Sequence, residues 1–207
     1  MSAGLSSRSP VGTARSDNEA KYRSRNPVVR RLVARFLQRV GDLVEAERPR
    51  RILEVGCGEA MVIEYLGARV PAARFHGVEL DAEALARGRA RCPGVSFLRA
   101  DAYDLPFESG SHDLVLCLEV LEHLREPDRA LREIRRVSRG GCLLSVPHEP
   151  FFRLGNLLRG KHVGRLGNPS DHVQHWGARG FTAFCARELA VRTATHSFPW
   201  LLVYGTV

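Results

Sequence analysis

The sequence lacks the long apolar runs that secretion and membrane insertion require. No stretch of its 207 residues approaches the ~20 consecutive apolar residues of a membrane span. The N-terminus is polar and has no apolar centre of the kind found in signal peptides. We therefore expect a cytoplasmic protein that has no membrane span.

Paired cysteines are also missing. The sequence has five cysteines, an odd number, and none of them stands in a Cys-x-x-Cys pair. This pattern predicts reduced side chains that pack as small hydrophobic groups, which again favours the cytoplasm, and it predicts no metal site. The cysteines are Cys57, Cys92, Cys117, Cys142 and Cys185.

Acidic residues are scarce at the N-terminal end. Residues 1–51 contain 12 Lys and Arg but 5 Asp and Glu, so they carry +7 of the net charge of +8. A basic arm can bind nucleic acid or an acidic membrane surface. Aromatic residues do not alternate with these arginines, apart from Tyr22, so nucleic acid is an unlikely partner and a solvated surface is favoured. Residues 1–17 are predicted to form a disordered basic tail.

One short stretch carries the strongest signal. Ile52 to Val55 predict a buried strand, Gly56 and Gly58 follow it, and a helical pattern begins at Ala60. The stretch lacks the third glycine of the dinucleotide fingerprint and the Gly-Lys-Ser/Thr of the phosphate loop. It has instead a carboxylate, Glu54, which would repel a pyrophosphate but suits a ligand that carries an ammonium and a sulfonium.

Predicted strands and helices alternate along the chain, which indicates a parallel sheet covered by helices on both faces. Asn26 is predicted to cap a long amphipathic helix that ends near Glu47, and Gly140 and Gly141 are predicted to stop a later one. Two final strands without a helix between them predict an antiparallel hairpin at the sheet edge. The expected strands are 52–55, 74–80, 95–99, 113–118, 142–146, 189–197 and 200–207, and the expected helices are 26–47, 60–68, 81–91, 128–137 and 181–187.

Four motifs at the ends of four successive predicted strands resemble the class I S-adenosylmethionine-dependent methyltransferases of the small-molecule type. They are Ile52-Leu53-Glu54-Val55-Gly56-Cys57-Gly58, Gly77-Val78-Glu79-Leu80-Asp81, Ala100-Asp101-Ala102, and Asp113-Leu114-Val115 running into Val120-Leu121-Glu122-His123-Leu124. The resemblance implies a doubly wound, Rossmann-like α/β fold. Its seven-stranded sheet would be mostly parallel, with an antiparallel last strand. It also implies S-adenosylmethionine as cofactor.

The resemblance also implies cofactor roles for individual residues. Glu54 and the Gly56–Gly58 turn would hold the methionine portion, Glu79 the ribose, and Leu80 the adenine ring. Asp101 and Ala102 would meet the adenine amino group, and Tyr22 is expected in an N-terminal lid. The complete predicted cofactor set is Tyr22, Glu54, Gly56, Cys57, Gly58, Glu79, Leu80, Asp101, Ala102, Cys117, Leu118 and Glu119.

The acceptor is expected in the segment 148–176, which is rich in histidine and arginine. His148, His172 and His175 are candidate bases, and Arg153, Arg159, Trp176 and His123 are candidate substrate contacts. These residues predict a small-molecule acceptor that carries an acidic group, with O-methylation favoured.

Two alternatives to this function remain open. One is a nucleic-acid methyltransferase, although Leu118-Glu119-Val120-Leu121 stands where such enzymes carry Asn/Asp-Pro-Pro-aromatic. The other is a non-catalytic subunit that binds the cofactor. We expect one methyltransferase domain over residues 18–207, with a helical lid at 18–47 and a substrate-side insertion at 148–176.

Overall fold

A computed structural model describes residues 21–149 and 173–207. Its centre is a seven-stranded sheet with the strand order β3-β2-β1-β4-β5-β7-β6. Neighbouring strands run parallel from β3 to β5, whereas β7 is antiparallel to both β5 and β6. The strands are β1 Arg51–Val55, β2 Arg74–Glu79, β3 Ser96–Arg99, β4 His112–Leu118, β5 Ser138–Pro147, β6 Ala190–Ser197 and β7 Trp200–Thr206.

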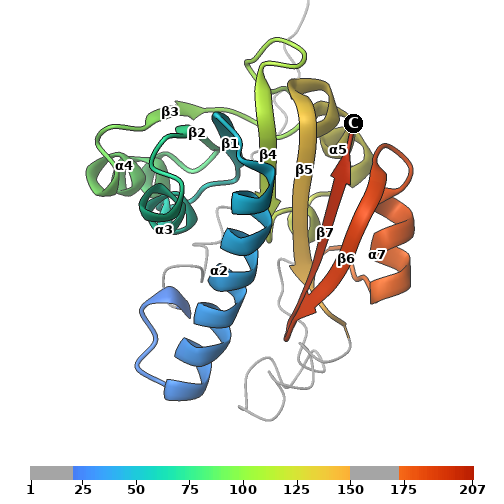
Figure 1. Cartoon of the computed structure of the whole chain (residues 1–207), viewed down its shortest axis with the longest axis horizontal. Coiled ribbons are helices and arrows are strands. Elements are labelled where there is room, and N and C mark those ends of the chain that lie inside the picture. The colour runs from blue at the N-terminus through green and yellow to red at the C-terminus, as the bar shows by residue number, and fades with distance from the viewer. Residues whose placement is uncertain (1–20, 150–172) are drawn as a thin grey trace, which may run out of the picture.

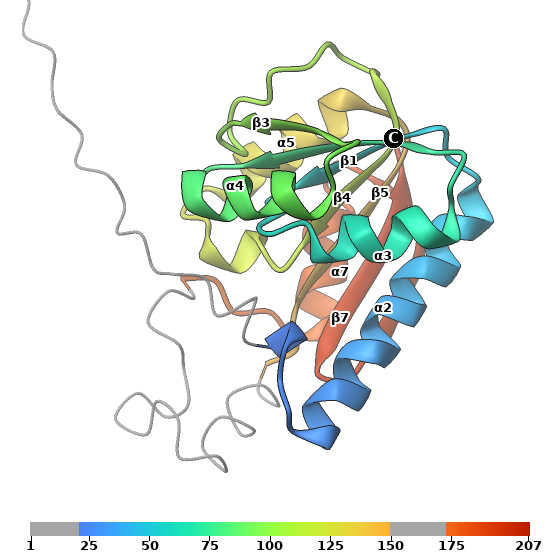
Figure 2. The same cartoon turned by 90° about the vertical axis from the view of Figure 1, so that its left-hand side faces the viewer.

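Helices cover both faces of this sheet (Figures 1 and 2). Side chains of α2, α3 and α4 pack against one face, and side chains of α5 and α7 pack against the other. This arrangement confirms the predicted doubly wound α/β fold. The helices are α2 Pro27–Glu47, α3 Met61–Arg69, α4 Ala82–Arg91, the 3-10 turn η1 Leu121–His123, α5 Pro127–Val137 and α7 Ala178–Cys185.

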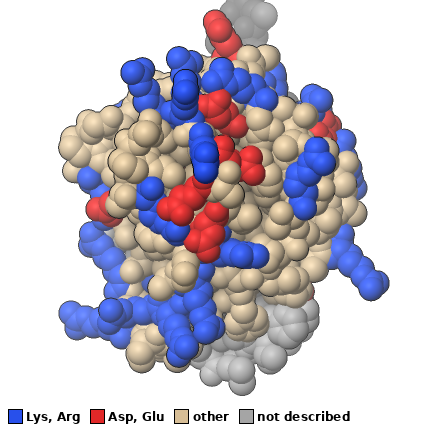
Figure 3. Space-filling model, in the orientation of Figure 1, with Lys and Arg blue, Asp and Glu red and all other residues tan. Residues whose placement is uncertain are grey.

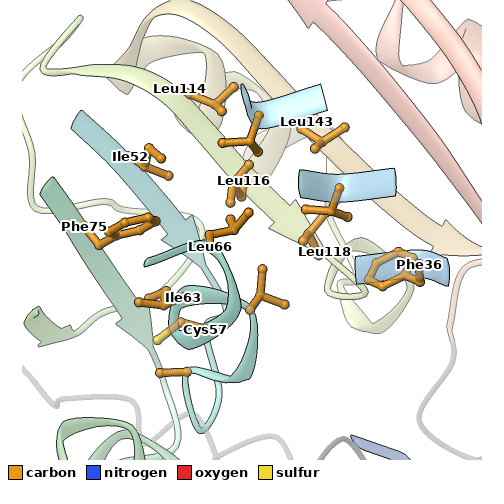
Figure 4. Packing of buried hydrophobic residues seen from close by; sticks show 14 of the residues in the cluster. Phe36, Ile52, Cys57, Ile63, Leu66, Phe75, Leu114, Leu116, Leu118 and Leu143 are labelled. Atoms are coloured by element: carbon orange, nitrogen blue, oxygen red, sulfur yellow. The ribbon is translucent and has the colours of Figure 1, made fainter. Parts of the chain in front are cut away.

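The central strand β4 is apolar because both of its faces are buried. Leu114, Leu116 and Leu118 point to the α2–α3 side, where Figure 4 shows them among Phe36, Ile63 and Leu66. Val115 and Cys117 alternate with them and pack on the α5–α7 side. Alternation between two cores is what a strand inside a three-layer fold requires.

Local signals set the helix starts as predicted. The Asn26 side chain accepts hydrogen bonds from the backbone N–H groups of Val28 and Val29, and Asp81 caps α4 through Glu83 and Ala84. The apolar stripe of α2 is buried against the sheet at Phe36, Val40 and Val44. The segment is therefore anchored over most of its length.

The prediction that Gly140 and Gly141 stop a helix is wrong, because both lie within β5. A Cβ on Gly140 would lie 2.5 Å from the Asp113 carbonyl oxygen, and one on Gly141 would lie 2.5 Å from the Tyr204 ring. The absence of a side chain at these two glycines therefore allows groups of the neighbouring strands to lie close to β5. The final hairpin is present at the sheet edge, with β6 outermost and β7 between β5 and β6.

Candidate active site

The turn after β1 holds three residues in the left-handed region. The φ angles are +72° at Gly56, +51° at Gly58 and +61° at Ala60. A Cβ on Gly56 would lie 2.3 Å from a methyl group of Val120, so packing requires glycine there. A Cβ on Gly58 would meet nothing within 4 Å, so space lies beside the backbone of this buried residue. Ala60 bears a strain of about 1 kcal/mol in this conformation.

Glu79, at the end of β2, joins this turn to the neighbouring strand. One carboxylate oxygen accepts hydrogen bonds from the backbone N–H groups of Leu80 (2.8 Å) and Asp81 (2.9 Å). The other accepts from the N–H of Gly58 at 2.9 Å. Three backbone donors therefore fix this carboxylate beside the glycine turn, and the oxygen that accepts from Gly58 keeps one lone pair for a further donor.

Glu54 is a buried acid next to the same turn. Its exposed fraction is 3%, and its Oε2 atom has no hydrogen-bond partner within the described ranges. Burial, followed by the negative charge of Glu79, raises the pKa of Glu54 to about 8. A buried carboxyl with an unsatisfied oxygen is costly, so a cationic ligand would stabilise its ionised form.

Lys21 and Tyr22, which precede α2, lie over this acidic turn. The Lys21 ammonium pairs with the carboxylate of Glu119 and lies 5.3 Å and 5.5 Å from the ring centroids of Tyr22 and Trp200. Burial and then the charge of Glu119 raise the pKa of the Tyr22 hydroxyl. Glu119 itself has a φ of +59° and a buried Oε1 atom without a hydrogen-bond partner among the residues described.

These groups enclose a cavity of about 20 Å³, which is enough for roughly one water molecule. Its wall combines the glycine turn with the start of α3, the end of β4 and the two residues ahead of α2. The lining residues are Lys21, Tyr22, Glu54, Gly56, Cys57, Gly58, Glu59, Met61, Val62 and Leu118.

The next predicted cofactor residues lie at the same edge of the sheet, beyond this cavity. Leu80 follows Glu79, and its apolar side chain is 56% exposed to solvent. Asp101 follows β3, and its side chain accepts a hydrogen bond from the Tyr103 backbone at 3.0 Å. Ala102, beside it, packs partly buried against the α5-side core. The ends of β1, β2 and β3 thus lie in adjacent positions.

Cys117 is placed differently from the other predicted cofactor residues. Its side chain is fully buried in the α5–α7 core, on the face of β4 opposite to the glycine turn. Leu118, the next residue, points to the other side and lines the cavity.

The acceptor-side predictions are divided among several places. The His148 ring lies 5.2 Å from that of His196, and burial lowers the pKa of His148. His175 Nδ1 lies 3.7 Å from Glu149 Oε1. His123 is exposed on η1. Trp176 packs on two rings of α7, with centroids 5.6 Å from Phe181 and 5.3 Å from Phe184. His172, Arg153 and Arg159 lie outside the described residues.

Sequence reasoning missed Glu59 and Lys21. Glu59 is 2% exposed within the glycine turn, and its Oε1 atom accepts a hydrogen bond from Arg87 at 3.1 Å. Glu59 could have been identified from the sequence, because it is a carboxylate that directly follows Gly58 in the predicted turn. Lys21 lies 98 residues from its partner Glu119, and no local pattern connects the two.

Two searches of the described residues found nothing. No three His, Cys, Asp or Glu side chains gather in residues 21–149 and 173–207 as a metal ion would require. Within the same ranges, no helix has both the length and the apolar character needed to cross a bilayer.

Residues 53–146 match the family model described as a methyltransferase domain. The chain is 31% identical over 139 residues to ajmaline N-methyltransferase of Rauvolfia serpentina, covering 63% of this chain and 47% of the relative. It is 35% identical over 106 residues to fatty-acid O-methyltransferase of Mycolicibacterium smegmatis, covering 50% and 39%. The chain thus spans less than half the length of these curated relatives.

The fold is shared with the crystal structure of magnesium protoporphyrin IX methyltransferase from Synechocystis PCC 6803 with bound S-adenosylhomocysteine. That structure superposes with a TM-score of 0.69 at 15% sequence identity, covering 92% of this chain and 94% of the other. At this identity the likeness concerns the fold alone.

Proposed function

Because this chain belongs to the class I S-adenosylmethionine-dependent methyltransferases, we propose that it methylates a small-molecule acceptor that carries an acidic group, with oxygen favoured as the accepting atom. The observation that carries the methyl-donor part of the proposal is a pair of carboxyl groups, the buried Glu54 and the partly buried Glu119, each with a buried oxygen lacking a hydrogen-bond partner in the described parts of the chain. Glu54 stands two residues before the glycine turn, and Glu119 pairs with Lys21, which lines the same cavity as Gly58.

The residues at this edge fit the cofactor. S-adenosylmethionine supplies a methyl group on a sulfonium, which is already activated for displacement. Glu54 and Glu119 would stabilise its positive charges, and the Gly58 backbone would approach its methionine portion. Glu79, held by three backbone donors, would accept a ribose hydroxyl on its remaining lone pair. Leu80 would cover the adenine, whose amino group would meet Asp101 and Ala102.

The two residues ahead of α2 would act as a lid. The cavity of about 20 Å³ is far smaller than the cofactor, and the Lys21 ammonium pairs with Glu119, one of the two carboxyl groups that would face the ligand. Binding would therefore require Lys21 and Tyr22 to move outward and then close again over the ligand. The rest of the predicted lid, α2, packs on the sheet through Phe36, Val40 and Val44 and would stay in place.

The protein's contribution to methyl transfer would be alignment and the exclusion of water, effects that can amount to ~7–11 kcal/mol. A hydroxyl acceptor also needs a base. Burial lowers the pKa of His148, so its imidazole is neutral at pH 7 and able to take a proton. His175, whose Nδ1 lies 3.7 Å from Glu149 Oε1, would be a second candidate for this base.

The names of the relatives include both an O-methyltransferase of fatty acids and an N-methyltransferase of ajmaline. A carboxylic acid as acceptor would suit Arg153 and Arg159 of the acceptor segment, which we propose hold its negative charge. The functional proposal is tested with S-adenosylmethionine labelled in the methyl group and a panel of acids, phenols, alcohols and amines.

With the accepted acid identified, Arg153→Ala and Arg159→Ala should each raise KM roughly tenfold or more while the Kd for S-adenosylhomocysteine stays unchanged. Arg132→Ala, on the exposed face of α5, is the matched control. A preference for neutral or cationic acceptors, with both arginine variants kinetically silent, would contradict the acidic acceptor.

A further inference from the structure

The charges along α2 and the residues before it are arranged in two blocks. Residues 21–41 contain seven Lys and Arg and no Asp or Glu, whereas Asp42, Glu45 and Glu47 follow near the end of the helix. Helix dipoles favour the opposite order, with acids in the first turn and bases in the last, and α2 has neither. Helix stability therefore does not account for this arrangement.

Many of the cations in the first block have no acidic partner. Arg25, Arg30, Arg31 and Arg35 are exposed, and no carboxylate of the described residues pairs with them. The acids of the second block are engaged, since Arg69 of α3 pairs with Asp42 and Glu45. Figure 3 shows the consequence, with Lys and Arg gathered over the lower half of α2 and Asp and Glu over its upper half.

One stripe of this helix combines positive charge with an apolar side chain. Val28, Arg31, Arg35 and Arg39 follow at helical spacing and thus share one face of α2, over about 16 Å. Val28 is 64% exposed, the most exposed of the large apolar side chains in the described residues.

The stripe continues into a surface pocket. Arg35 and Arg39 line a hollow of about 370 Å³, whose other wall is the β6–β7 hairpin from Thr195 to Phe198. The Arg39 guanidinium donates to Thr195 at 3.2 Å, and Phe198 is 57% exposed at the tip of the hairpin. We call the surface formed by Val28, Arg31, Arg35, Arg39 and Phe198 the α2–hairpin face.

We propose that the α2–hairpin face docks on an anionic phospholipid surface. Its arginines would bind lipid phosphates, for which guanidinium groups are well suited because they donate two parallel hydrogen bonds. Val28 and Phe198 would enter the boundary between headgroups and acyl chains. Two exposed apolar side chains beside the cations favour a membrane over RNA, whose single strands bind to platforms of several stacked aromatic rings.

The position of this face gives the docking a consequence. The first turn of α2, the tip of the β6–β7 hairpin and the carboxyl ends of β4 and β5 lie at the same end of the molecule (Figure 1). Lys21 and Tyr22, which lie at this end, also line the cavity beside the glycine turn. A docked protein would therefore present the edge that carries its candidate active site to the lipid.

The test is sedimentation of the full chain with vesicles, comparing phosphatidylcholine alone with phosphatidylcholine that contains phosphatidylglycerol. We expect binding to the anionic vesicles only, weakening with salt. Arg31→Gln with Arg35→Gln should reduce that binding roughly tenfold or more. Phe198→Ser should reduce it as well, without changing its salt dependence. The matched control pair, Arg132→Gln with Arg179→Gln, removes the same charge from exposed positions on α5 and α7 and should bind as the wild type does.

Several results would overturn the proposal. Equal losses in the test and control pairs would mean attraction through net charge alone. Equal binding to both kinds of vesicle, or to neither, would exclude an anionic membrane as the partner. Displacement by inorganic phosphate, but not by chloride at the same ionic strength, would reveal a small-anion site instead.

Loss of RNA binding or of acidic-protein binding in the Arg31/Arg35 variant, with vesicle binding intact, would assign the face to that partner. Thermal unfolding of each variant shows whether its fold is retained.

Discussion

At the scale of single residues, the account depends on a buried acid that is poised to change its charge. Glu54 has a pKa of about 8, so most molecules hold it protonated at pH 7. A ligand that is positively charged favours the ionised form, and binding must then release the proton. The cofactor affinity is therefore coupled to pH through this one side chain.

We predict that the affinity for S-adenosylmethionine rises as the pH increases from 6 to 8 and levels off above the pKa of Glu54. The direction follows because protons compete with the cation below that pKa. Titration calorimetry at pH 7 in buffers of different ionisation enthalpy should show proton release. In Glu54→Gln the release and the pH dependence should both shrink, and affinity at high pH should fall. An unchanged pH profile in that variant would refute the role given to Glu54.

Local patterns and the family resemblance predicted that Glu54, Gly56, Gly58 and Glu79 lie at strand ends beside a turn, and the structure has them there; their roles toward a cofactor stay predictions. It could not supply the pairing of Lys21 with Glu119, because that contact depends on where α2 lies against the sheet. The same holds for the side chain of Cys117, whose direction depends on which face of β4 it occupies.

At the scale of elements, one arginine of α3, Arg69, makes several ion pairs and hydrogen bonds to α2. Arg69 donates to both oxygens of Glu45 at 2.7 Å, to Asp42 at 2.9 Å and to the backbone of Gln38 at 3.2 Å. A Cβ on Gly41 would lie 2.1 Å from the guanidinium, so glycine makes room for this clamp. The contacts hold α2 against α3, the helix that begins directly after the glycine turn.

A double-mutant cycle tests this clamp. Arg69→Ala should lower the free energy of unfolding, because it removes a bidentate ion pair and a helix contact. In the Arg69→Ala background, Gly41→Ala should then raise the free energy of unfolding by about 1 kcal/mol, because alanine has a higher helix propensity than glycine. In the wild type the same substitution should raise it by less, because the new methyl group would collide with Arg69. Urea unfolding measures all four proteins. The same effect of Gly41→Ala in both backgrounds would argue against the clamp.

Elements with strong local signals were predictable, as α2 and α4 show through their caps at Asn26 and Asp81. The place of Gly140 and Gly141 in a strand was not predictable, because a pair of glycines after a helical pattern usually marks the end of the helix. Their reason lies in Asp113 and Tyr204, which only the folded sheet brings beside them.

At the scale of the whole molecule, the proposed function needs one end of the chain to move while the sheet stays fixed. Phe36, Val40 and Val44 hold α2 on the sheet, so the movement falls on the residues before Pro27. Hydrogen exchange should therefore slow in residues 21–26 when S-adenosylhomocysteine binds, and remain unchanged in α7, which packs on the opposite face. Unchanged protection of residues 21–26 would contradict the proposal that these residues close over the cofactor.

The measurement that tests the central claim most directly is calorimetric titration of S-adenosylhomocysteine into the wild type and Glu79→Ala. Glu83→Ala, which removes an exposed carboxylate on α4, is the control, and NADH is the competing ligand. We predict that the wild type and Glu83→Ala bind S-adenosylhomocysteine alike, that Glu79→Ala binds it about 1–3 kcal/mol more weakly, and that NADH does not bind. Binding of NADH without binding of S-adenosylhomocysteine would contradict the account.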